Sequence, residues 1–487
     1  MLNLKDEIYR ELPQGEPVHA ADRPYGQQIT FEKCRELLHT VFRGILPGFG
    51  YTVRNGEIVW ADNILNAIRR RYIVLAEAET GAGTTLAYLA AAILAKRGRL
   101  NDYHNKAYYP RMSYIDMAQM PIVITASYIA LQKVILSEYI PALSEFLVEH
   151  GLIKTPVTAV LRKGRKHYVC EHRLRSCLKP GQNEKIRRKL RELLAPQTTI
   201  DLAEIQGLDH YTQRKISVPD KCLYGCPYRD HCAYLRFREH ANSSMIDIQV
   251  VNHSYFLADL KLRAGNQRPL IPNYQTVIID DAPKFLSAAR TFFGAKLSSF
   301  TLPELKDMVY KLNLESESAQ ILARKTAKKI FDESVKLFKG LDELSRNNEA
   351  TPFIVIDRET VRHLRNLRDI AERLDKLLMS EPVRESSRGK KSAILWNLAI
   401  VRRQLASLTG YSEHICRLEK PDINSPAGTN QEIQLCAIPQ NLDTILYESL
   451  WSRGIPTMLT PGTSLMGRDI KKNLGLEKLG NNLMAVQ

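Results

Sequence analysis

The stretch LAEAETGAGTTLAYLAAAI, residues 75–93, decides the fold class of this chain. A short apolar strand is predicted over residues 72–76, a glycine-bearing loop follows it, and a helix-forming run comes next. In a phosphate-binding loop, backbone N–H groups and a helix N-terminus hold a polyphosphate in this layout. The usual pattern is G-x-x-x-x-G-K-[ST], whereas here Gly83 is followed by Thr84 and Thr85. The stretch therefore has the shape of a nucleotide loop without its lysine.

A pair of carboxylates follows a second apolar strand. In TVIIDDAPKF the β-branched run ends at Asp280 and Asp281. In P-loop NTPases an acid at such a strand end holds Mg²⁺, and the next acid often orients the attacking water. The alternative is that the two acids simply face solvent at the end of the strand and take no part in chemistry. Together with the loop upstream, the pair favours common ancestry with these NTPases.

The runs IDIQVVN and YQTVIID are continuous and β-branched, which is typical of a parallel sheet covered on both faces. Residues 284 to 415 instead predict long amphipathic helices, with ESSRGKKS as an exposed loop between them. Strand signals return in IQLCAIP and IPTMLTPGTSL. We therefore expect an α/β domain with a helical block inserted, and the sheet closing after that block.

The chain has 487 residues and a formal net charge of +16. Such an excess favours polyanions such as nucleic acid, with solubility alone as the alternative. Basic residues concentrate in RKGRK and EKIRRKLREL. Apolar runs long enough for a membrane span or a signal peptide are lacking in the sequence, which predicts a cytoplasmic protein without a membrane partner.

Eight cysteines are present, and Cys222, Cys226 and Cys232 form a C-x3-C-x5-C pattern. Without an export signal a disulfide framework is not expected. With Cys170 upstream, four thiolates in one basic region suit an iron–sulfur cluster or Zn²⁺. Cys177 is an alternative fourth ligand. The simpler alternative is that these thiols bind no metal.

The motifs together resemble those of the DinG/XPD-type helicases of superfamily 2, which carry an iron–sulfur domain. They occur in the family's order: YTVRNGE, EAETGAGTTLAYL, VITASYIALQ, RKGRKHYVC, CLYGCPYRDHC, IQVVNHSYFLADL, IIDDAP and PTMLTPGTSL. The resemblance implies a RecA-like P-loop parallel sheet with an inserted iron–sulfur domain and an inserted helical arch domain. It also implies ATP-dependent 5′→3′ DNA unwinding, with single-stranded DNA or a forked duplex as partner.

The resemblance also implies a division of the chain. The expected segments are an N-terminal segment (1–50), the first motor domain in three parts (51–160, 246–285 and 431–487), an iron–sulfur domain (161–245) and an arch domain (286–430). The chain stops near where the family's second motor domain would begin, so we expect that domain to be absent from this chain.

The family's site residues carry over to matching positions. ATP would be held by the loop residues Gly81, Gly83, Thr84 and Thr85, with Arg54 and Glu57 at the base, and Mg²⁺ and the water by Asp280 and Asp281. One [4Fe–4S] cluster would be held by Cys170, Cys222, Cys226 and Cys232. DNA contacts would come from Arg162, Lys163, Arg165, Lys166 and Gln132.

The sequence departs from the family mostly at residues that would bind or hydrolyse ATP. Thr84 replaces the lysine, Glu57 the glutamine that reads adenine, and Asp281 the glutamate, while Pro283 and Pro461 replace a histidine and a serine. Binding of ATP and Mg²⁺ is therefore expected to be weak or lost. The alternative to a helicase is an inactive, helicase-derived accessory subunit of a nucleic-acid-processing complex, with CRISPR-type defence as one setting. A basic zinc-binding structural protein is a third reading.

Overall fold

The structure is a computed structural model that describes most of the chain. The described residues are 29–48, 50–76, 84–100, 119–178, 188, 190–193, 201–205, 207–208, 210–219, 222, 225–346, 356–384, 387–409, 414–419, 433–461 and 469–486.

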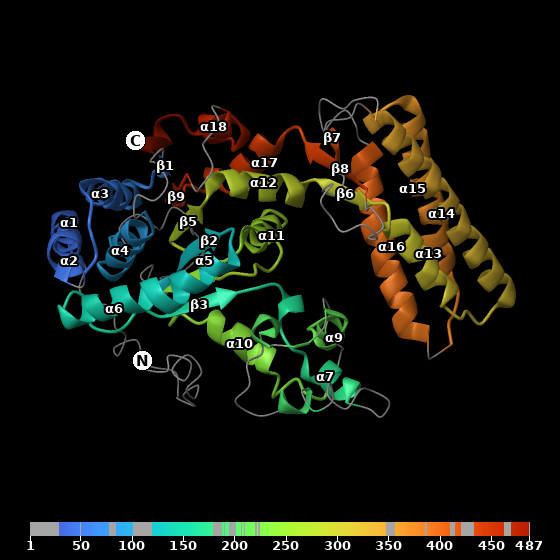
Figure 1. Cartoon of the computed structure of the whole chain (residues 1–487), viewed down its shortest axis with the longest axis horizontal. Coiled ribbons are helices and arrows are strands. Elements are labelled where there is room, and N and C mark those ends of the chain that lie inside the picture. The colour runs from blue at the N-terminus through green and yellow to red at the C-terminus, as the bar shows by residue number, and fades with distance from the viewer. Residues whose placement is uncertain are drawn as a thin grey trace. The chain divides into compact units, whose positions relative to one another are not determined.

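Seven strands of the described chain form one parallel sheet in the order β10-β1-β9-β5-β2-β4-β3 (Figure 1). Their bounds are β1 (Ile73–Ala76), β2 (Ile122–Ala126), β3 (Ala159–Arg162), β4 (Ile248–Val251), β5 (Thr276–Asp280), β9 (Thr457–Leu459) and β10 (Leu483–Val486). All six neighbouring pairs run parallel. The carboxyl ends of all seven strands therefore meet at one edge of the sheet, where parallel sheets usually bind ligands.

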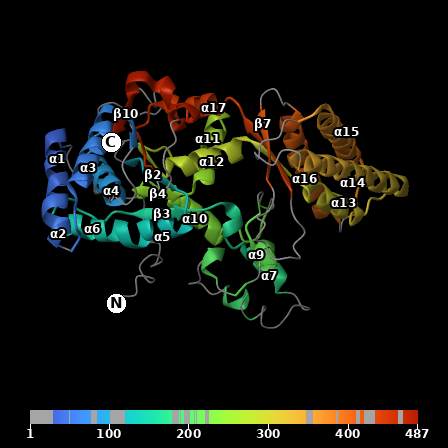
Figure 2. The same ribbon diagram turned by 45° about the horizontal axis from the view of Figure 1, so that its top comes forward.

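Helices cover this sheet, and further helices form a bundle of their own (Figures 1 and 2). The bounds of the first group are α1 (Phe31–Thr40), α2 (Leu46–Gly48), α3 (Asn55–Arg70), α4 (Thr84–Arg97), α5 (Ile129–Val134), α6 (Ile140–Glu149), α7 (Glu171–Cys177), α9 (His210–Ile216), α10 (Ala233–Ala241), α11 (His253–Ala264) and α12 (Ala282–Phe293). The second group comprises α13 (Thr301–Tyr310), α14 (Glu317–Arg346), α15 (Arg358–Ser380), α16 (Arg388–Thr409), α17 (Leu442–Ser449) and α18 (Ile470–Asn473).

The strands are buried because helices cover them. β1, β2, β4 and β5 are buried at every position. Alternate residues such as Val74, Ile124 and Ile278 share one core cluster with residues of α1, α3 and α4. A strand buried on both faces is apolar at most of its positions, which is why these strands could be recognised in the sequence.

The chain divides into two compact units. The first contains residues 1–285, 448–469 and 477–487, and with them the parallel sheet. The second contains residues 286–447 and 470–476. It combines the long helices α13 to α16 with an antiparallel sheet of order β6-β8-β7, made by β6 (Ala295–Ser298), β7 (His414–Glu419) and β8 (Gln434–Pro439).

The helices of the second unit follow from their sequence. In α15 the apolar residues Leu364, Leu367, Ala371 and Leu374 recur every three or four positions and are fully buried. Asp357 begins the helix as an N-cap, because its carboxylate accepts a hydrogen bond from the backbone N–H of Thr360 at 2.7 Å. The helical block is thus an amphipathic bundle around its own core.

Several sequence-based expectations need correction. IQLCAIP forms β8 of the antiparallel sheet, so of these two expected strands only the one in IPTMLTPGTSL belongs to the parallel sheet. ESSRGKKS is not wholly a loop, since α16 begins at Arg388 within it. The strands β3, β6, β7 and β10 were not expected, and β6 lies within the segment that was predicted to be helical. No helix in the described residues is long and apolar enough to span a membrane.

Candidate nucleotide and cluster sites

The predicted nucleotide loop lies between β1 and α4. The strand ends at Ala76 and the helix begins at Thr84, while Gly81 and Gly83 lie outside the described residues. The side chain of Thr85 makes a hydrogen bond with the hydroxyl of Tyr88, one turn further along α4. The start of this helix is thereby tied to a side chain that reaches the neighbouring strands.

Asp280 ends β5 and is buried there, with 8% of its surface exposed. The Tyr88 hydroxyl donates to its Oδ2 at 2.8 Å, and the Thr460 hydroxyl lies 3.4 Å from its Oδ1. Burial raises the pKa of Asp280, and these two hydrogen bonds oppose the rise. Both oxygens of the predicted Mg²⁺ ligand are therefore held, by residues of α4 and of the segment after β9.

Asp281 adopts a left-handed conformation, with φ of 69°. Its backbone N–H donates to Thr460 Oγ1 at 3.0 Å, and its Oδ1 accepts the backbone N–H of Lys284 at 3.1 Å. The ammonium of Lys284 lies 3.3 Å from its Oδ2. Burial raises the pKa of Asp281. A left-handed residue other than glycine costs about 1 kcal/mol or more, so these contacts must hold it in place.

Three side chains at this edge were missed by the sequence reading: Tyr88, Thr460 and Lys284. Tyr88 and Thr460 lie inside motifs that had been recognised, but their partner Asp280 is remote in sequence. Lys284 follows Asp281 by three positions, a spacing at which side chains of a helix are neighbours. That spacing is the one signal that could have identified it.

Arg54 and Glu57 lie at the start of α3, a helix that contacts α4 and β1. Arg54 is the exposed N-cap residue, and its carbonyl accepts the backbone N–H of Glu57 at 3.0 Å. Burial raises the pKa of Glu57, whereas Arg54 opposes this rise. A carboxylate in the first helical turn is favoured by the helix dipole. Reading of a nucleotide base by these two residues stays a prediction.

Gln132, a predicted DNA contact, is 2% exposed. Its amide nitrogen donates to the carbonyl of Ala126 at 2.7 Å. This bond closes the turn between β2 and α5. In this position the side chain shapes the turn and does not face solvent.

Two of the four predicted cluster cysteines are neighbours. Cys170 precedes α7 and Cys232 precedes α10, and both pack against the apolar cluster of Tyr168, Val218 and Tyr234. Burial raises the pKa of Cys170, and the nearby Cys232 thiol adds to the rise.

The other two cysteines are placed differently. Cys226 is half-buried and Cys222 is exposed. A guanidinium N–H of Arg165 donates to Cys222 Sγ at 3.0 Å. None of these four cysteines forms a disulfide, so each could supply a thiolate ligand to an iron–sulfur cluster. Within the described part of the chain, however, no three Cys, His, Asp or Glu side chains are arranged to hold a metal ion. The quartet therefore stays a prediction.

The basic run RKGRK splits into inward and outward residues. Arg162 is 3% exposed, and its guanidinium donates to Asn242 Oδ1 at 2.8 Å. Lys163 is buried and pairs with Asp201. Arg165 is half-buried and Lys166 is exposed. Arg162 and Lys163 are engaged inside the protein, so our proposal for DNA contacts keeps only Arg165 and Lys166.

Comparison with known proteins shows which proteins the chain is related to. No protein-family model matches the chain. The chain is 27% identical over 294 residues to the ATP-dependent DNA helicase YoaA of Escherichia coli (strain K12), covering 57% of this chain and 40% of that protein. It is 25% identical over 280 residues to the ATP-dependent helicase DinG of Mycobacterium tuberculosis (strain ATCC 25618 / H37Rv), covering 53% and 38%. The 3'-5' exonuclease DinG of Bacillus subtilis (strain 168) is 26% identical over 265 residues, covering 52% and 25%.

The matched part is well under two thirds of the length of each of these relatives. Among solved structures, one described as "XPD_Helicase" superimposes with a TM-score of 0.42 at 14% identity, covering 89% of this chain and 62% of that one. A superposition at this level carries no argument about function. Over about half of its length, the chain is homologous to the YoaA and DinG proteins, most of which are described as ATP-dependent helicases.

Proposed function

We propose that this chain is a DNA-helicase-family protein that binds single-stranded DNA and has a degenerate ATP site. The observation that carries the proposal is the network at the sheet edge. Tyr88, next to the loop that lacks its lysine, holds Asp280, and Lys284 pairs with Asp281. Hydrolysis requires the phosphate's charge to be neutralised and a free base to orient water. With Thr84 in the loop and Asp281 paired, both requirements are weakened.

The order of the strands supports the RecA-like assignment. β9 lies between the strand that leads into the loop and the strand that ends in the carboxylates. Its continuation supplies Thr460, whose hydroxyl touches both Asp280 and the backbone of Asp281. A residue that contacts both acids can respond to the state of the nucleotide, as expected for a helicase motif.

The region between β3 and β4 would carry the iron–sulfur cluster. Cys170 and Cys232 already adjoin, and Cys222 and Cys226 lie on the segment that leads to Cys232. When bound, the cluster would supply a rigid cross-link between α7 and α10. Iron and sulfide analysis of anaerobically purified protein tests this, and stoichiometric zinc without iron would contradict it.

DNA binding would use the exposed end of the basic run. Lys166 is solvent-exposed, and Arg165 lies 5.7 Å from the Tyr234 ring centroid. Phosphate contacts of this kind make affinity depend steeply on salt and little on base sequence. Affinity for single-stranded DNA that does not change between low and high salt would contradict the proposal.

The deciding experiment is an ATPase assay with and without saturating single-stranded DNA, on the parent and on Thr84→Lys. We expect the parent to hydrolyse ATP at or near background. Turnover at rates typical of helicases would favour the alternative, an active ATP-dependent 5′→3′ helicase. An accessory role in a nucleic-acid-processing complex, including CRISPR-type defence, is compatible with an inactive motor.

A further inference from the structure

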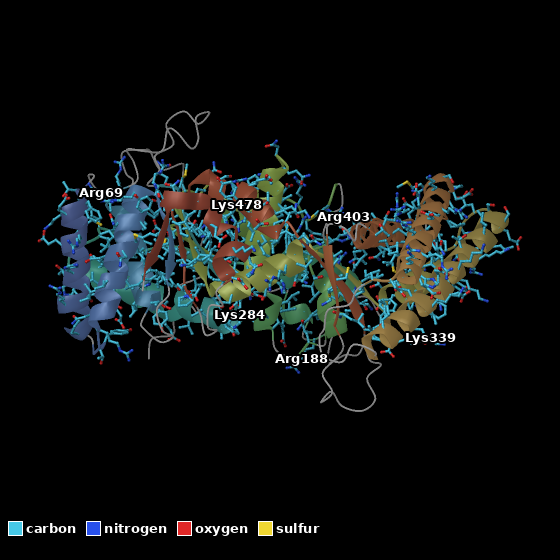
Figure 3. The ribbon with its side chains drawn as sticks, turned by 90° about the horizontal axis from the view of Figure 1, so that it is seen from above. Arg69, Arg188, Lys284, Lys339, Arg403 and Lys478 are labelled. Atoms are coloured by element: carbon cyan, nitrogen blue, oxygen red, sulfur yellow. The ribbon has the colours of Figure 1, made fainter. Side chains whose placement is uncertain are left out.

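The outer face of the long helix α14 carries exposed lysines. Between residues 325 and 339 they are Lys325, Lys328, Lys329, Lys336 and Lys339. On the opposite face of the helix, Ala323, Ala327 and Ile330 are buried in the core of the helical bundle. A helix turns by about 100° per residue, so all of these lysines except Lys329 project within about 40° of the direction away from that core. These four, Lys325, Lys328, Lys336 and Lys339, are called the lysine stripe below; Lys339 is labelled in Figure 3.

The charges of the lysine stripe are mostly not neutralised. In the described part of the chain, three of its lysines have no ion-pair or hydrogen-bond partner, and only Lys336 has a carboxylate nearby, Glu333 Oε2 at 3.7 Å. Asp332 is exposed in the middle of the stripe, yet no cation among the described residues lies within ion-pair distance of it. The stripe is therefore a row of positive charges that face solvent.

The neighbouring helix α15 carries its charges differently. Its exposed cations Arg362 and Lys376 each lie 2.9 Å from a carboxylate of the same helix, Glu359 and Glu372. Opposite charges three or four positions apart stabilise a helix, whereas like charges at that spacing destabilise it. The mixed pattern of α15 is sufficient for solubility. The unpaired lysines of α14 repel one another instead, and an anionic partner would relieve that repulsion.

The spacing of the lysine stripe indicates which polyanion it fits. Its members form two pairs, Lys325 with Lys328 and Lys336 with Lys339, and the facing members of the two pairs are eight positions apart. At about 1.5 Å per residue, these two lysines are about 12 Å apart along the helix axis. The major groove of B-form DNA is also about 12 Å wide, and a phosphate backbone runs along each of its edges. Asp332, midway between the pairs, would then face the open groove and not a phosphate.

We propose that the lysine stripe of α14 binds double-stranded DNA across the major groove, with one lysine pair on the phosphates of each strand. A single strand has no second backbone at a fixed distance, and the major groove of A-form RNA is deep and narrow. The inference rests on the proposed function in one respect, since it takes nucleic acid as the partner. It assigns duplex DNA to a surface separate from Arg165 and Lys166, which we proposed for single strands.

The test removes one lysine of each pair, as Lys328→Gln with Lys339→Gln. The matched control is Arg362→Gln with Lys376→Gln, which removes the same charge from α15, where carboxylates already neutralise it. Binding of a short labelled DNA duplex to the full chain is measured by fluorescence anisotropy at several salt concentrations. The α14 variant should bind about 10- to 50-fold more weakly at about 0.1 M salt, and its log affinity should depend less steeply on log salt by about 1.8, or about 0.9 for each lost phosphate contact. The control should stay within about 2-fold of the parent.

Two further variants and measurements exclude indirect effects. Lys328→Arg with Lys339→Arg keeps both charges and should keep the affinity and the salt dependence of the parent. The free energy of unfolding of the α14 variant should not fall, because both lysines are exposed and unpaired. A loss of duplex binding by a protein of unchanged stability is then a property of the surface.

Several outcomes would overturn the inference. An unchanged duplex affinity in the α14 variant would mean that the stripe is only solvated surface, and an equal loss in the α15 control would mean that only net charge matters. An equal loss of affinity for a single strand of the same length would make the stripe a general polyanion surface. A parent that binds vesicles with anionic lipids but no duplex would assign the stripe to a membrane. A parent that binds duplex but no single strand would overturn the proposed function and leave this inference standing.

Discussion

Replacing Arg162 with alanine should destabilise the protein rather than weaken DNA binding directly. The guanidinium Nη1 donates to Asn242 Oδ1 at 2.8 Å and lies 3.3 Å from Gln249 Oε1 and 3.4 Å from the Ala241 carbonyl. A hydrogen bond from a charged group is worth about 1.5–3 kcal/mol, and the two longer contacts add less. Truncation also leaves buried acceptors unpaired. The free energy of unfolding should therefore fall by about 2–4 kcal/mol.

The matched change is Lys166→Ala, in the same run but on an exposed side chain. Its free energy of unfolding should stay within about 0.5 kcal/mol of the parent. Its affinity for single-stranded DNA should fall, and the slope of log affinity against log salt should decrease by about 0.7 for each phosphate that the lysine neutralises. Urea unfolding followed by circular dichroism and DNA titrations at several salt concentrations measure both quantities.

The reasoning fails if the two variants behave alike. An Arg162→Ala protein with an unchanged urea midpoint and a reduced salt slope would mean that this arginine reaches DNA. A Lys166→Ala protein with full DNA affinity and slope would mean that the exposed end of the run is only solvated surface.

Three further predictions concern buried groups of the sheet unit. Asp247→Ala leaves Lys96, which is 1% exposed, without its ion-pair partner at 3.5 Å, so urea unfolding should show a loss of about 3–5 kcal/mol. Burial lowers the pKa of His253 to about 4 from an ordinary 6.5, so the folded state binds fewer protons between these values. Stability should then fall by up to about 3 kcal/mol as pH drops from 6.5 to 4, and His253→Gln should flatten that part of the curve. Tyr88→Phe removes the donor to the buried Asp280 and should cost about 1–3 kcal/mol in the same assay; an unchanged midpoint would show that this hydrogen bond adds nothing.

The sequence was most informative where burial is complete. β1, β2, β4 and β5 are apolar at nearly every position because both faces of each strand are covered, so the runs stood out. β3 includes a charged residue and pairs along one side only, so its four residues gave little signal. The strand in IQLCAIP was readable, but its membership of the antiparallel sheet depends on β6 and β7, which are remote in sequence.

The candidate site, like the fold, could be predicted from the sequence only in part. Asp280 follows from a strand that ends in an acid, whereas the hydroxyl that holds it comes from Tyr88, in another motif. A run such as RKGRK suggests a surface, and only the fold shows that Asn242 and Asp201 draw two of its side chains inward. Local patterns indicate which residues are present, and their partners depend on contacts between distant segments.

The order of the strands has a consequence for how the protein is made. β1, which precedes the predicted nucleotide loop, has β9 on one side and β10 on the other. A ribosome completes β1 early, but neither neighbour exists until Thr457 and the residues after it have emerged. Throughout that interval both edges of β1 lack their native hydrogen-bond partners, and such edges attract other chains. The two hydrogen-bonding edges of β1 are therefore both satisfied only after β9 and β10 have been synthesised.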